Sequence, residues 1–376
     1  MKIVYCLNSI REAGGIAKVT VVKANALAEV PGNEVFVCVS DHSEDQPYSL
    51  SSKVKLVDLN IDYYKDDWKS KWHVLKGIVV KRRKHRKALK EVLNKINPDI
   101  VISVGLCEKY FLPEIKGTAK AVREIHSSKN YRNMLADGLL SKLKANVLNI
   151  YDYRWAIKKY DRIVVLTNED QKLHCSDNKK VSVISNPLTF SSDTPFNLTN
   201  KTIITLGRLA DEKNHSSLIR AFAIVAKRHP DWTLKIYGEG SLKEILQKQI
   251  ETMRLTDNVK LMGQTLTPIK VYEESSIFVL SSRFEGFPLV LIEAMECGLP
   301  VVSYDCPCGP KDIISDDDDG FLIECGNEES IADKINYLIE HPEKRREMGN
   351  AAQIKARNYA LDNIIPQWMV LFKNLC

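Results

Sequence analysis

The chain has 376 residues and is 44% hydrophobic, a length that predicts two domains rather than one core. Its nine cysteines form no C-x-x-C pair, and no apolar run reaches the roughly 18 residues of a transmembrane helix, so we expect a cytoplasmic protein with reduced thiols and no zinc site. The net charge of +6 is uneven, because residues 1–190 carry 33 Lys and Arg against 21 Asp and Glu while the remainder carries 21 against 27, which suggests different partners for the two halves.

Short β-branched runs alternate with longer helical patterns in the first half of the chain. Strands are predicted at residues 2–7, 34–40, 53–59, 99–105, 120–126 and 162–167, and helices at about 15–29, 72–96 and 138–160. Near-continuous apolar strands separated by helices indicate a parallel sheet that is covered on both faces.

A second alternation follows residues 185–200, a segment rich in Ser, Thr, Asn and Pro that has the composition of a linker. Strands are predicted at residues 202–207, 233–238, 258–263, 276–281 and 299–304, and helices at about 214–228, 241–253, 267–274, 288–297 and 328–340. The sequence therefore predicts an α/β fold with two Rossmann-like domains facing a central cleft, where ligands bind beyond the carboxyl ends of the strands. We expect the domains to be residues 1–190 and 191–360, with a C-terminal helix in 361–376 that packs back on the first domain.

Two cations follow the first predicted strand of the second half. Arg208 comes directly after Gly207, and Lys213 immediately precedes the next helix. Cationic side chains beside a helix N-terminus suit a phosphate group. The alternative is that both are surface residues paired with Asp211 and Glu212.

Three further features at predicted strand ends give weaker signals. Gly238 ends the strand at 233–238 and would let backbone approach a ligand closely, although a plain tight turn is the alternative. Gly14 and Gly15 begin a helix and could offer N–H groups to an anion, but no G-x-G-x-x-G dinucleotide motif surrounds them. His126 ends the strand at 120–126 and would face the cleft, unless it is a structural histidine.

Two carboxylates flank the start of the helix predicted at 288–297, for which Pro288 suits the first position. Glu285 lies in the preceding loop, and Glu293 lies within the apolar run LVLIEAM. A charged side chain in such a run needs a polar partner. A sugar diol would serve, because two hydroxyls can donate to the two carboxylate oxygens, and an Arg or Lys of the core is the alternative.

Together these residues resemble a known family. Glu285 and Glu293 match the E-x7-E pattern of retaining GT-B glycosyltransferases, and the chain resembles glycosyltransferase family 4. The matching segments also include GRLADEKN (207–214), YGEGS (237–241), the block 285–314 and DDGFLI (318–323). The resemblance covers nearly all of the second domain, while the first domain matches more loosely.

The resemblance implies a role for each matching residue. Arg208 and Lys213 would hold the donor diphosphate and stabilise the leaving nucleoside diphosphate. Glu293 would bind the ribose hydroxyls, and Glu285 would contact hydroxyls of the donor sugar. His126 would sit near that sugar. The remaining donor-binding positions are backbone segments, of which Pro288 has no N–H to donate: Gly14, Gly15, Gly207, Gly238, Gly286, Phe287, Pro288 and Leu289.

The resemblance also implies an activity. It is the retaining transfer of a hexosyl or N-acetylhexosaminyl group from a nucleotide sugar, expected to be UDP-linked, to a sugar hydroxyl of a growing, lipid-linked surface glycan such as capsule or lipopolysaccharide. The first domain would bind the acceptor and the second the donor. No cofactor and no metal ion are expected, because Arg208 and Lys213 can supply the positive charge. The alternatives are a non-catalytic nucleotide-sugar-binding subunit and a GT-B-fold epimerase or phosphorylase.

A basic segment in the first half suggests where the acceptor is met. Residues 68–96 combine Trp68, Trp72 and apolar positions with the run KRRKHRK at 81–87. Such a segment can lie on an anionic membrane, so we expect peripheral attachment to the inner face of the plasma membrane. The alternative is a solvated face of a core-packed helix, and nucleic-acid binding is not expected, because no aromatic-interleaved RNA-binding motif accompanies the charges. The expected anchor comprises Lys81, Arg82, Arg83, Lys84, Arg86 and Lys87.

Overall fold

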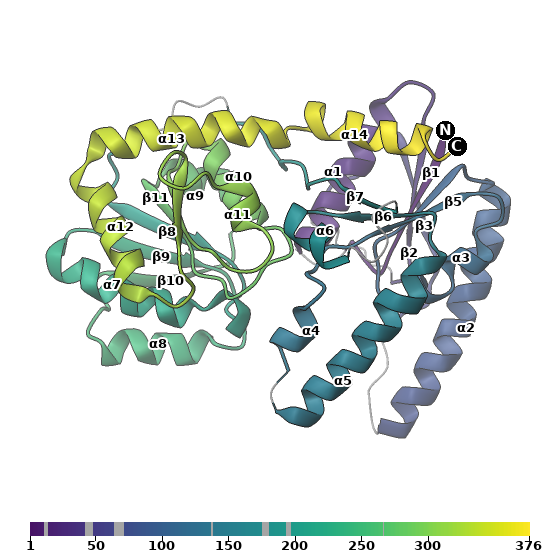
Figure 1. The fold of residues 1–376 in the computed structure, drawn as a ribbon, viewed down its shortest axis with the longest axis horizontal. Coiled ribbons are helices and arrows are strands. Elements are labelled where there is room, and N and C mark those ends of the chain that lie inside the picture. Colours follow the sequence, from purple (N-terminus) through teal and green to yellow (C-terminus); the bar gives the residue numbers. More distant parts are fainter. Residues whose placement is uncertain are drawn as a thin grey trace. The chain divides into compact units, whose positions relative to one another are not determined.

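The structure, a computed structural model, describes residues 1–10, 14–41, 48–63, 71–136, 138–174, 180–192, 197–265 and 267–376. The chain forms two compact units, Met1–Thr189 together with Leu361–Cys376, and Phe190–Ala360. Each unit contains one parallel sheet with helices packed against it (Figure 1). Among the described residues, no helix combines the length and apolar character needed to cross a membrane.

The first unit is built on a seven-stranded sheet in the order β3-β2-β1-β4-β5-β6-β7. The central strand β1 pairs in parallel with β2 on one side and with β4 on the other, with Ile3 opposite both Val35 and Ile100. Its strands are short runs of mostly buried residues, as expected for a sheet covered on both faces. They are β1 (Lys2–Leu7), β2 (Glu34–Val39), β3 (Val54–Asp58), β4 (Ile100–Ser103), β5 (Lys120–Glu124), β6 (Arg162–Val165) and β7 (Val181–Val183).

Helices cover both faces of this sheet. On one face, α1 (Gly15–Glu29) and the C-terminal α14 (Leu361–Lys373) pack around Trp368 and Phe372, which are fully buried. On the other face, α2 (Lys71–Ile96) contributes Leu89 and Leu93. The unit also contains η1 (Glu108–Tyr110), α3 (Leu112–Ile115), α4 (Tyr131–Met134), α5 (Leu139–Ile150), the π-helix η2 (Tyr151–Ala156), η3 (Ile157–Lys159) and α6 (Asn168–His174).

The second unit has a six-stranded sheet in the order β10-β9-β8-β11-β12-β13, and its core includes Phe222, Trp232 and Phe321. The strands are β8 (Thr202–Leu206), β9 (Thr233–Tyr237), β10 (Val259–Gly263), β11 (Ile277–Leu280), β12 (Val301–Tyr304) and β13 (Gly320–Ile323). The helices are η4 (Asp211–Lys213), α7 (His215–Arg228), α8 (Lys243–Thr252), α9 (Pro268–Glu273), α10 (Leu289–Glu296), α11 (Pro310–Ile313), α12 (Glu328–Glu340), α13 (Pro342–Ala356) and η5 (Arg357–Tyr359).

The predicted class, α/β with two Rossmann-like domains, is confirmed. Several details differ from the sequence-based prediction, among them the helices α6 and α13, which were not predicted. The helix predicted at 138–160 is divided into α5, η2 and η3. The edge strands β7 and β13 were not predicted, because runs of three and four residues carry little periodicity. The helix predicted at 288–297 begins at Leu289, with Pro288 as the residue that precedes its first turn.

Candidate functional site

The predicted phosphate cations both follow β8, but they differ in their surroundings. Arg208 is 75% exposed, and its Nη2 lies 2.6 Å from Oε1 of Glu212, so for this residue the predicted surface pairing is present. Lys213 ends the short helix η4 and is only 19% exposed. Its aliphatic chain lies close to the end of β8, because a Cβ added at Gly207 would come within 3.3 Å of Lys213 Cδ.

Lys213 is paired with one of the two predicted carboxylates. Its Nζ lies 2.6 Å from Oε1 of Glu285, whose side chain is 9% exposed. The same carboxylate oxygen accepts a hydrogen bond of 2.6 Å from Ser282 Oγ, and the Glu285 N–H donates to Pro307 O. The loop after β11 is also tied to η4, since Ser281 Oγ donates to Lys213 O. Two strand-end loops therefore present an ammonium and a carboxylate side by side.

The backbone at this edge of the sheet is packed too closely for side chains. Gly207 N–H donates to Tyr237 O, which brings the ends of β8 and β9 together. Gly238 has φ of +149°, and a Cβ there would lie 1.9 Å from Gly207 O. Only glycine fits at Gly238, because its backbone lies against that of Gly207. The approach to a ligand at this position stays a prediction.

The second carboxylate, Glu293, lies in the middle of α10 and is 3% exposed. Tyr272 Oη, from α9, donates a hydrogen bond of 3.2 Å to its Oε2. Burial, reinforced by the Glu293 charge, raises the pKa of Tyr272 well above its usual value, so the phenol remains a donor. The carboxylate is thus held by a neutral donor inside an apolar helix, an arrangement that satisfies the requirement for a polar partner.

The backbone between the two carboxylates is fixed by packing. The Phe287 ring packs against Tyr359, with 5.7 Å between their centroids. Pro288 is buried against Gly309, where φ is +137° and a Cβ would come within 2.4 Å of Pro288 Cδ. Leu289 N–H donates to Phe287 O. Gly286 lies between Glu285 and this rigid turn, half-buried.

A histidine that sequence reasoning did not select supports the Arg208 loop. His215, the first residue of α7, is 3% exposed, and its Nε2 lies 3.2 Å from Arg208 O. Burial lowers the pKa of His215 to about 4, so the imidazole is neutral at physiological pH. A neutral ring with one N–H can donate to the Arg208 carbonyl and hold the loop in place.

The remaining predicted residues belong to the first unit. Gly14 precedes α1 and Gly15 is its first residue, with Gly14 O accepting from Lys18 N–H. His126 lies two residues beyond the end of β5, which stops at Glu124. Its side chain is 4% exposed, and its Nε2 lies 3.0 Å from Glu124 Oε1.

His126 belongs to a buried charged cluster that the sequence did not reveal. Glu124 also forms a buried ion pair with Lys23 of α1, whose Nζ lies 4.9 Å from the centre of the Trp368 ring. Burial alone would raise the pKa of Glu124, but Lys23 and His126 lower it to about 2. Burial lowers the pKa of His126. A permanently ionised Glu124 can therefore orient the imidazole.

The matching family model covers the whole site of the second unit. Residues 189–355 match the family described as glycosyl transferases group 1. This part of the chain is therefore similar to the group 1 glycosyltransferases. Over 370 residues, 98% of each protein, the chain is 28% identical to an uncharacterized glycosyltransferase of Haemophilus influenzae.

Two further proteins are similar to this chain, one in sequence and one in fold. Over 162 residues, 43% of this chain and 44% of the relative, it is 36% identical to the N-acetylgalactosamine-N,N'-diacetylbacillosaminyl-diphospho-undecaprenol 4-alpha-N-acetylgalactosaminyltransferase of Campylobacter jejuni. A mutant of Staphylococcus aureus TarM, crystallised with fondaparinux, alpha-GlcNAc-glycerol and UDP, shares the fold with a TM-score of 0.78 and 20% identity over 99% of each chain.

Sequence reasoning missed the residues that hold the predicted ones. Ser282 and Tyr272 contact the two glutamates, and Lys23 and Glu124 hold His126. Only Glu124 left a usable signal, since it is a carboxylate inside the predicted strand at 120–126 and therefore needed a partner. In the described ranges, no group of three or more His, Cys, Asp or Glu residues is placed to hold a metal ion.

Proposed function

We propose that the protein is a retaining glycosyltransferase that transfers a hexosyl or N-acetylhexosaminyl group from a UDP-sugar to a sugar hydroxyl of a lipid-linked glycan. The observation that carries the proposal is the pair formed by Lys213 and Glu285, 2.6 Å apart at the carboxyl ends of the strands of a group 1 glycosyltransferase domain. Support for the donor comes from the UDP bound to the related S. aureus structure, and support for the acceptor from the diphospho-undecaprenol in the name of the C. jejuni relative.

Lys213 and Glu285 suit the two groups that are joined by the bond that breaks, the diphosphate and the donor sugar. Lys213, with Arg208, would bind the diphosphate and stabilise the charge that grows on it as the bond to the sugar is cleaved. Glu285 would accept hydrogen bonds from hydroxyls of the donor sugar. In the resting enzyme Lys213 and Glu285 neutralise each other, so neither charge is left without a partner. On donor binding, Lys213 would exchange Glu285 for the diphosphate, and Glu285 would exchange Lys213 for the sugar hydroxyls.

The other residues would position the donor. Glu293, exposed by only 3%, would bind the ribose hydroxyls, and Gly207, Gly238 and Gly286 would let backbone approach the diphosphate. Gly14, Gly15 and His126 of the first unit would contact the diphosphate and the donor sugar. No step in this scheme requires a metal ion, since the cationic side chains supply the positive charge.

The deciding experiment measures nucleoside diphosphate release from a panel of nucleotide sugars, with and without glycan-lipid acceptors. A transferase releases stoichiometric diphosphate when an acceptor is present, whereas a binding subunit releases none and an epimerase converts the donor without release. Nuclear magnetic resonance of the product would then report whether the anomeric configuration is retained. An inverted product would contradict the retaining assignment, and absence of release with every donor would contradict the transferase.

We also propose that the first unit attaches to an anionic membrane through α2. Trp68 and the side chain of Trp72 lie outside the described residues. Of the expected anchor, Lys81 and Arg82 are half-buried, and Arg82 stacks 4.5 Å from the centre of the Tyr110 ring, so these two residues help to hold the fold. Arg83 and Lys87 are exposed, one helical turn apart.

The exposed pair on α2 gives a direct test of electrostatic attachment. Each basic residue near an anionic surface contributes about 1 kcal/mol, and this attraction fades within a Debye length of roughly 8 Å at physiological salt. Arg83→Gln with Lys87→Gln should therefore weaken co-sedimentation with anionic vesicles and reduce its salt dependence, while donor hydrolysis is unchanged. Sedimentation that is insensitive to both salt and these substitutions would rule out α2 as the electrostatic anchor.

A further inference from the structure

The helix α5 and the π-helix η2 that continues it carry a row of apolar side chains on their solvent side. Leu140 is 84% exposed and Trp155 67% exposed. The row recurs every three to four residues, so it follows one side of the helix. We call it the outer face, and it consists of Leu139, Leu140, Leu143, Val147, Ile150, Tyr151 and Trp155.

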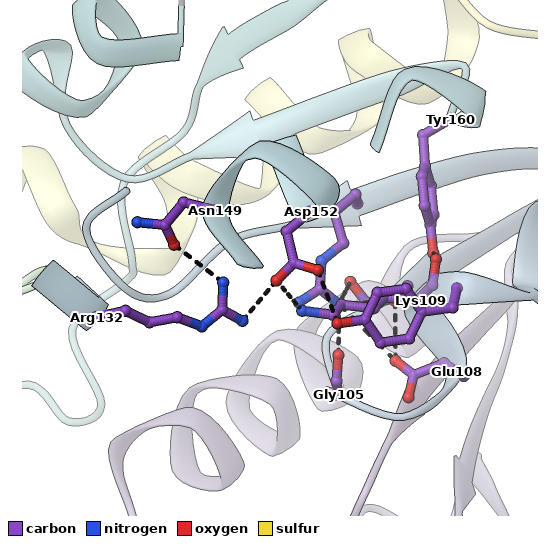
Figure 2. A network of polar contacts seen from close by, with 10 residues as sticks. Gly105, Glu108, Lys109, Arg132, Asn149, Asp152 and Tyr160 are labelled. Carbon is purple, nitrogen blue, oxygen red and sulfur yellow. Dashed lines mark hydrogen bonds and ion pairs between the residues drawn. The ribbon is translucent and has the colours of Figure 1, made fainter. Parts of the chain in front are cut away.

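The opposite side of the same helix is polar and contacts the rest of the unit, with Asp152 buried, Asn149 half-buried and Asn146 exposed (Figure 2). Asp152 accepts hydrogen bonds of 2.7 Å from both Lys109 Nζ and Tyr110 Oη, and of 2.5 Å from Arg132 Nη2. One turn earlier, Asn149 Oδ1 accepts from the same Arg132 guanidinium. Another turn earlier, Asn146 Oδ1 accepts from Asn133 of α4. This helix is therefore attached to its unit by a polar network.

This arrangement is the reverse of an ordinary surface helix, which buries its apolar side and exposes its polar side. Rotation of α5 by half a turn would bury the leucines, but it would also break the contacts of Asp152 with Lys109 and Arg132. The network thus fixes the apolar side outward. A contiguous exposed apolar surface of this kind marks an interaction site in most soluble proteins.

The charges around the outer face indicate what covers it. Between residues 139 and 160 the sole acidic residue of the sequence is Asp152, which the network buries. Lys142, Lys144 and Lys158 are exposed along the same segment. In a symmetric contact with a second copy, these lysines would face one another and repel. An anionic lipid surface offers them opposite charge and offers the leucines an apolar phase.

The aromatic residues fit the same partner. Tyr151 and Trp155 end the outer face, and with Tyr110, Ala156 and Lys159 they line an open pocket. Tyrosine and tryptophan concentrate at the level of lipid headgroups, where one end of the ring is apolar and the other is wet. In Figure 1, α5 and α2 extend beyond the sheet of the first unit in the same direction.

We propose that the outer face of α5 and η2 inserts into the headgroup region of an anionic bilayer and lies parallel to its plane. This inference deepens the proposed membrane attachment by adding an apolar insertion element to the charges of α2. It rests on the proposed function only because a lipid-linked acceptor would give the protein a reason to bind a membrane. The α-helical part, residues 139–150, would extend about 18 Å at 1.5 Å per residue, along the surface rather than across it.

The experiment uses vesicles of phosphatidylglycerol and phosphatidylcholine with the full chain. Changing Leu139, Leu143 and Val147 to Asn together should weaken vesicle binding at least tenfold, because the inserted apolar area is lost. The matched control is Ile245→Asn with Ile354→Asn, since these residues are 62% and 68% exposed in the second unit. The control should bind like the wild type. Equal binding by the triple variant and the wild type would overturn the proposal.

Trp155 provides a readout that electrostatic docking alone would not change. In a protein with Trp68→Phe and Trp72→Phe, brominated lipids should quench the tryptophan fluorescence on binding, and the further change Trp155→Phe should remove that quenching while binding persists. Quenching that is unchanged in Trp155→Phe would place the outer face outside the bilayer.

Light scattering tests the competing partner, a second copy of the chain. A wild-type dimer that the triple variant converts to a monomer would assign the outer face to a second copy and overturn the proposal. Donor hydrolysis, measured without vesicles on the same proteins, tests the proposed function separately.

Discussion

Lys213 Nζ lies 2.6 Å from Glu285 Oε1, although the two residues are 72 positions apart in the chain. The pair joins the loop after β8 to the loop after β11, and Ser282 completes the contact by donating to the same oxygen. A preformed pair at this place means that donor binding would separate two charges that already satisfy each other. The binding free energy of the donor would therefore depend on how well its diphosphate replaces Glu285 as the partner of Lys213. It would also depend on how well the sugar hydroxyls replace Lys213 as the partner of Glu285.

Replacing Lys213 by Ala should lower kcat more than it changes donor affinity. The diphosphate gains negative charge as its bond to the sugar breaks, so a cation stabilises the transition state more than the bound donor, and losses on the order of 10²-fold in kcat are typical. Steady-state kinetics with varied donor would measure this effect, with Lys227→Ala, an exposed position on α7, as control. A raised KM with unchanged kcat would contradict the assignment.

Replacing Glu293 by Ala should weaken binding of the nucleotide sugar. A hydrogen bond to a charged group contributes about 1.5–3 kcal/mol, which corresponds to a loss of roughly 10-fold to 150-fold in affinity. Titration calorimetry with the nucleoside diphosphate alone would measure it. Tyr272→Phe is the control, because it removes the phenol that contacts Glu293 and keeps the carboxylate. Unchanged affinity in a folded Glu293→Ala protein would exclude the ribose contact.

Stability should fall as the pH decreases from about 6.5 to 4, in part because of His215. Burial lowers the pKa of His215 to about 4, so between these values the unfolded chain binds a proton that the folded protein does not. The contribution of the neutral His215 ring to the free energy of unfolding is fully present above pH 6.5. Its loss should lower that free energy by about 3 kcal/mol at pH 4. Urea denaturation at several pH values should show a shallower decline for His215→Gln. An identical decline in the variant would contradict the neutral, buried state of the ring.

Removing the Asp152 carboxylate should destabilise the first unit strongly. Lys109 and Asp152 are 7% and 5% exposed, and loss of one partner from a buried ion pair costs about 3–5 kcal/mol. Chemical denaturation of Asp152→Ala would measure the loss, whereas Glu239→Ala, in the exposed pair with Lys243, should remain near the wild type. Lys109→Met combined with Asp152→Leu should recover most of the stability. If the double variant is as unstable as Asp152→Ala, the cost does not arise from an uncompensated charge.

The sequence predicted those features that repeat along the chain. The strands β1 and β9 and the helix α1 were predicted with bounds within a residue or so, because apolar runs and caps recur locally. The pairing of Lys213 with Glu285 was not predicted, since nothing local to residue 213 specifies a contact with residue 285. The buried Lys23 was missed for the same reason: within α1 it occupies an ordinary helical position, and only β5 supplies Glu124 beneath it.

The helix α5 illustrates a different limit. Its leucines repeat with helical spacing, and such a pattern normally predicts an apolar side that faces the core. The structure places that side outward, because Asp152 and Asn149 on the other side find partners in Lys109 and Arg132. Which side of an amphipathic helix is buried depends on distant residues, so periodicity predicts the helix and leaves its orientation open.

The position of α14 has a consequence for how the chain is made. This helix follows the whole of the second unit, yet Trp368 and Phe372 are fully buried in the first unit, where the Trp368 ring also packs against the Lys23 ammonium. During synthesis the first unit leaves the ribosome without this part of its core, with α1 and its buried ammonium uncovered. At about 5–20 residues per second, the second unit takes roughly 10–30 s to emerge before α14 can dock. For that interval the nascent first unit depends on chaperones, or on its own partial stability, to avoid aggregation.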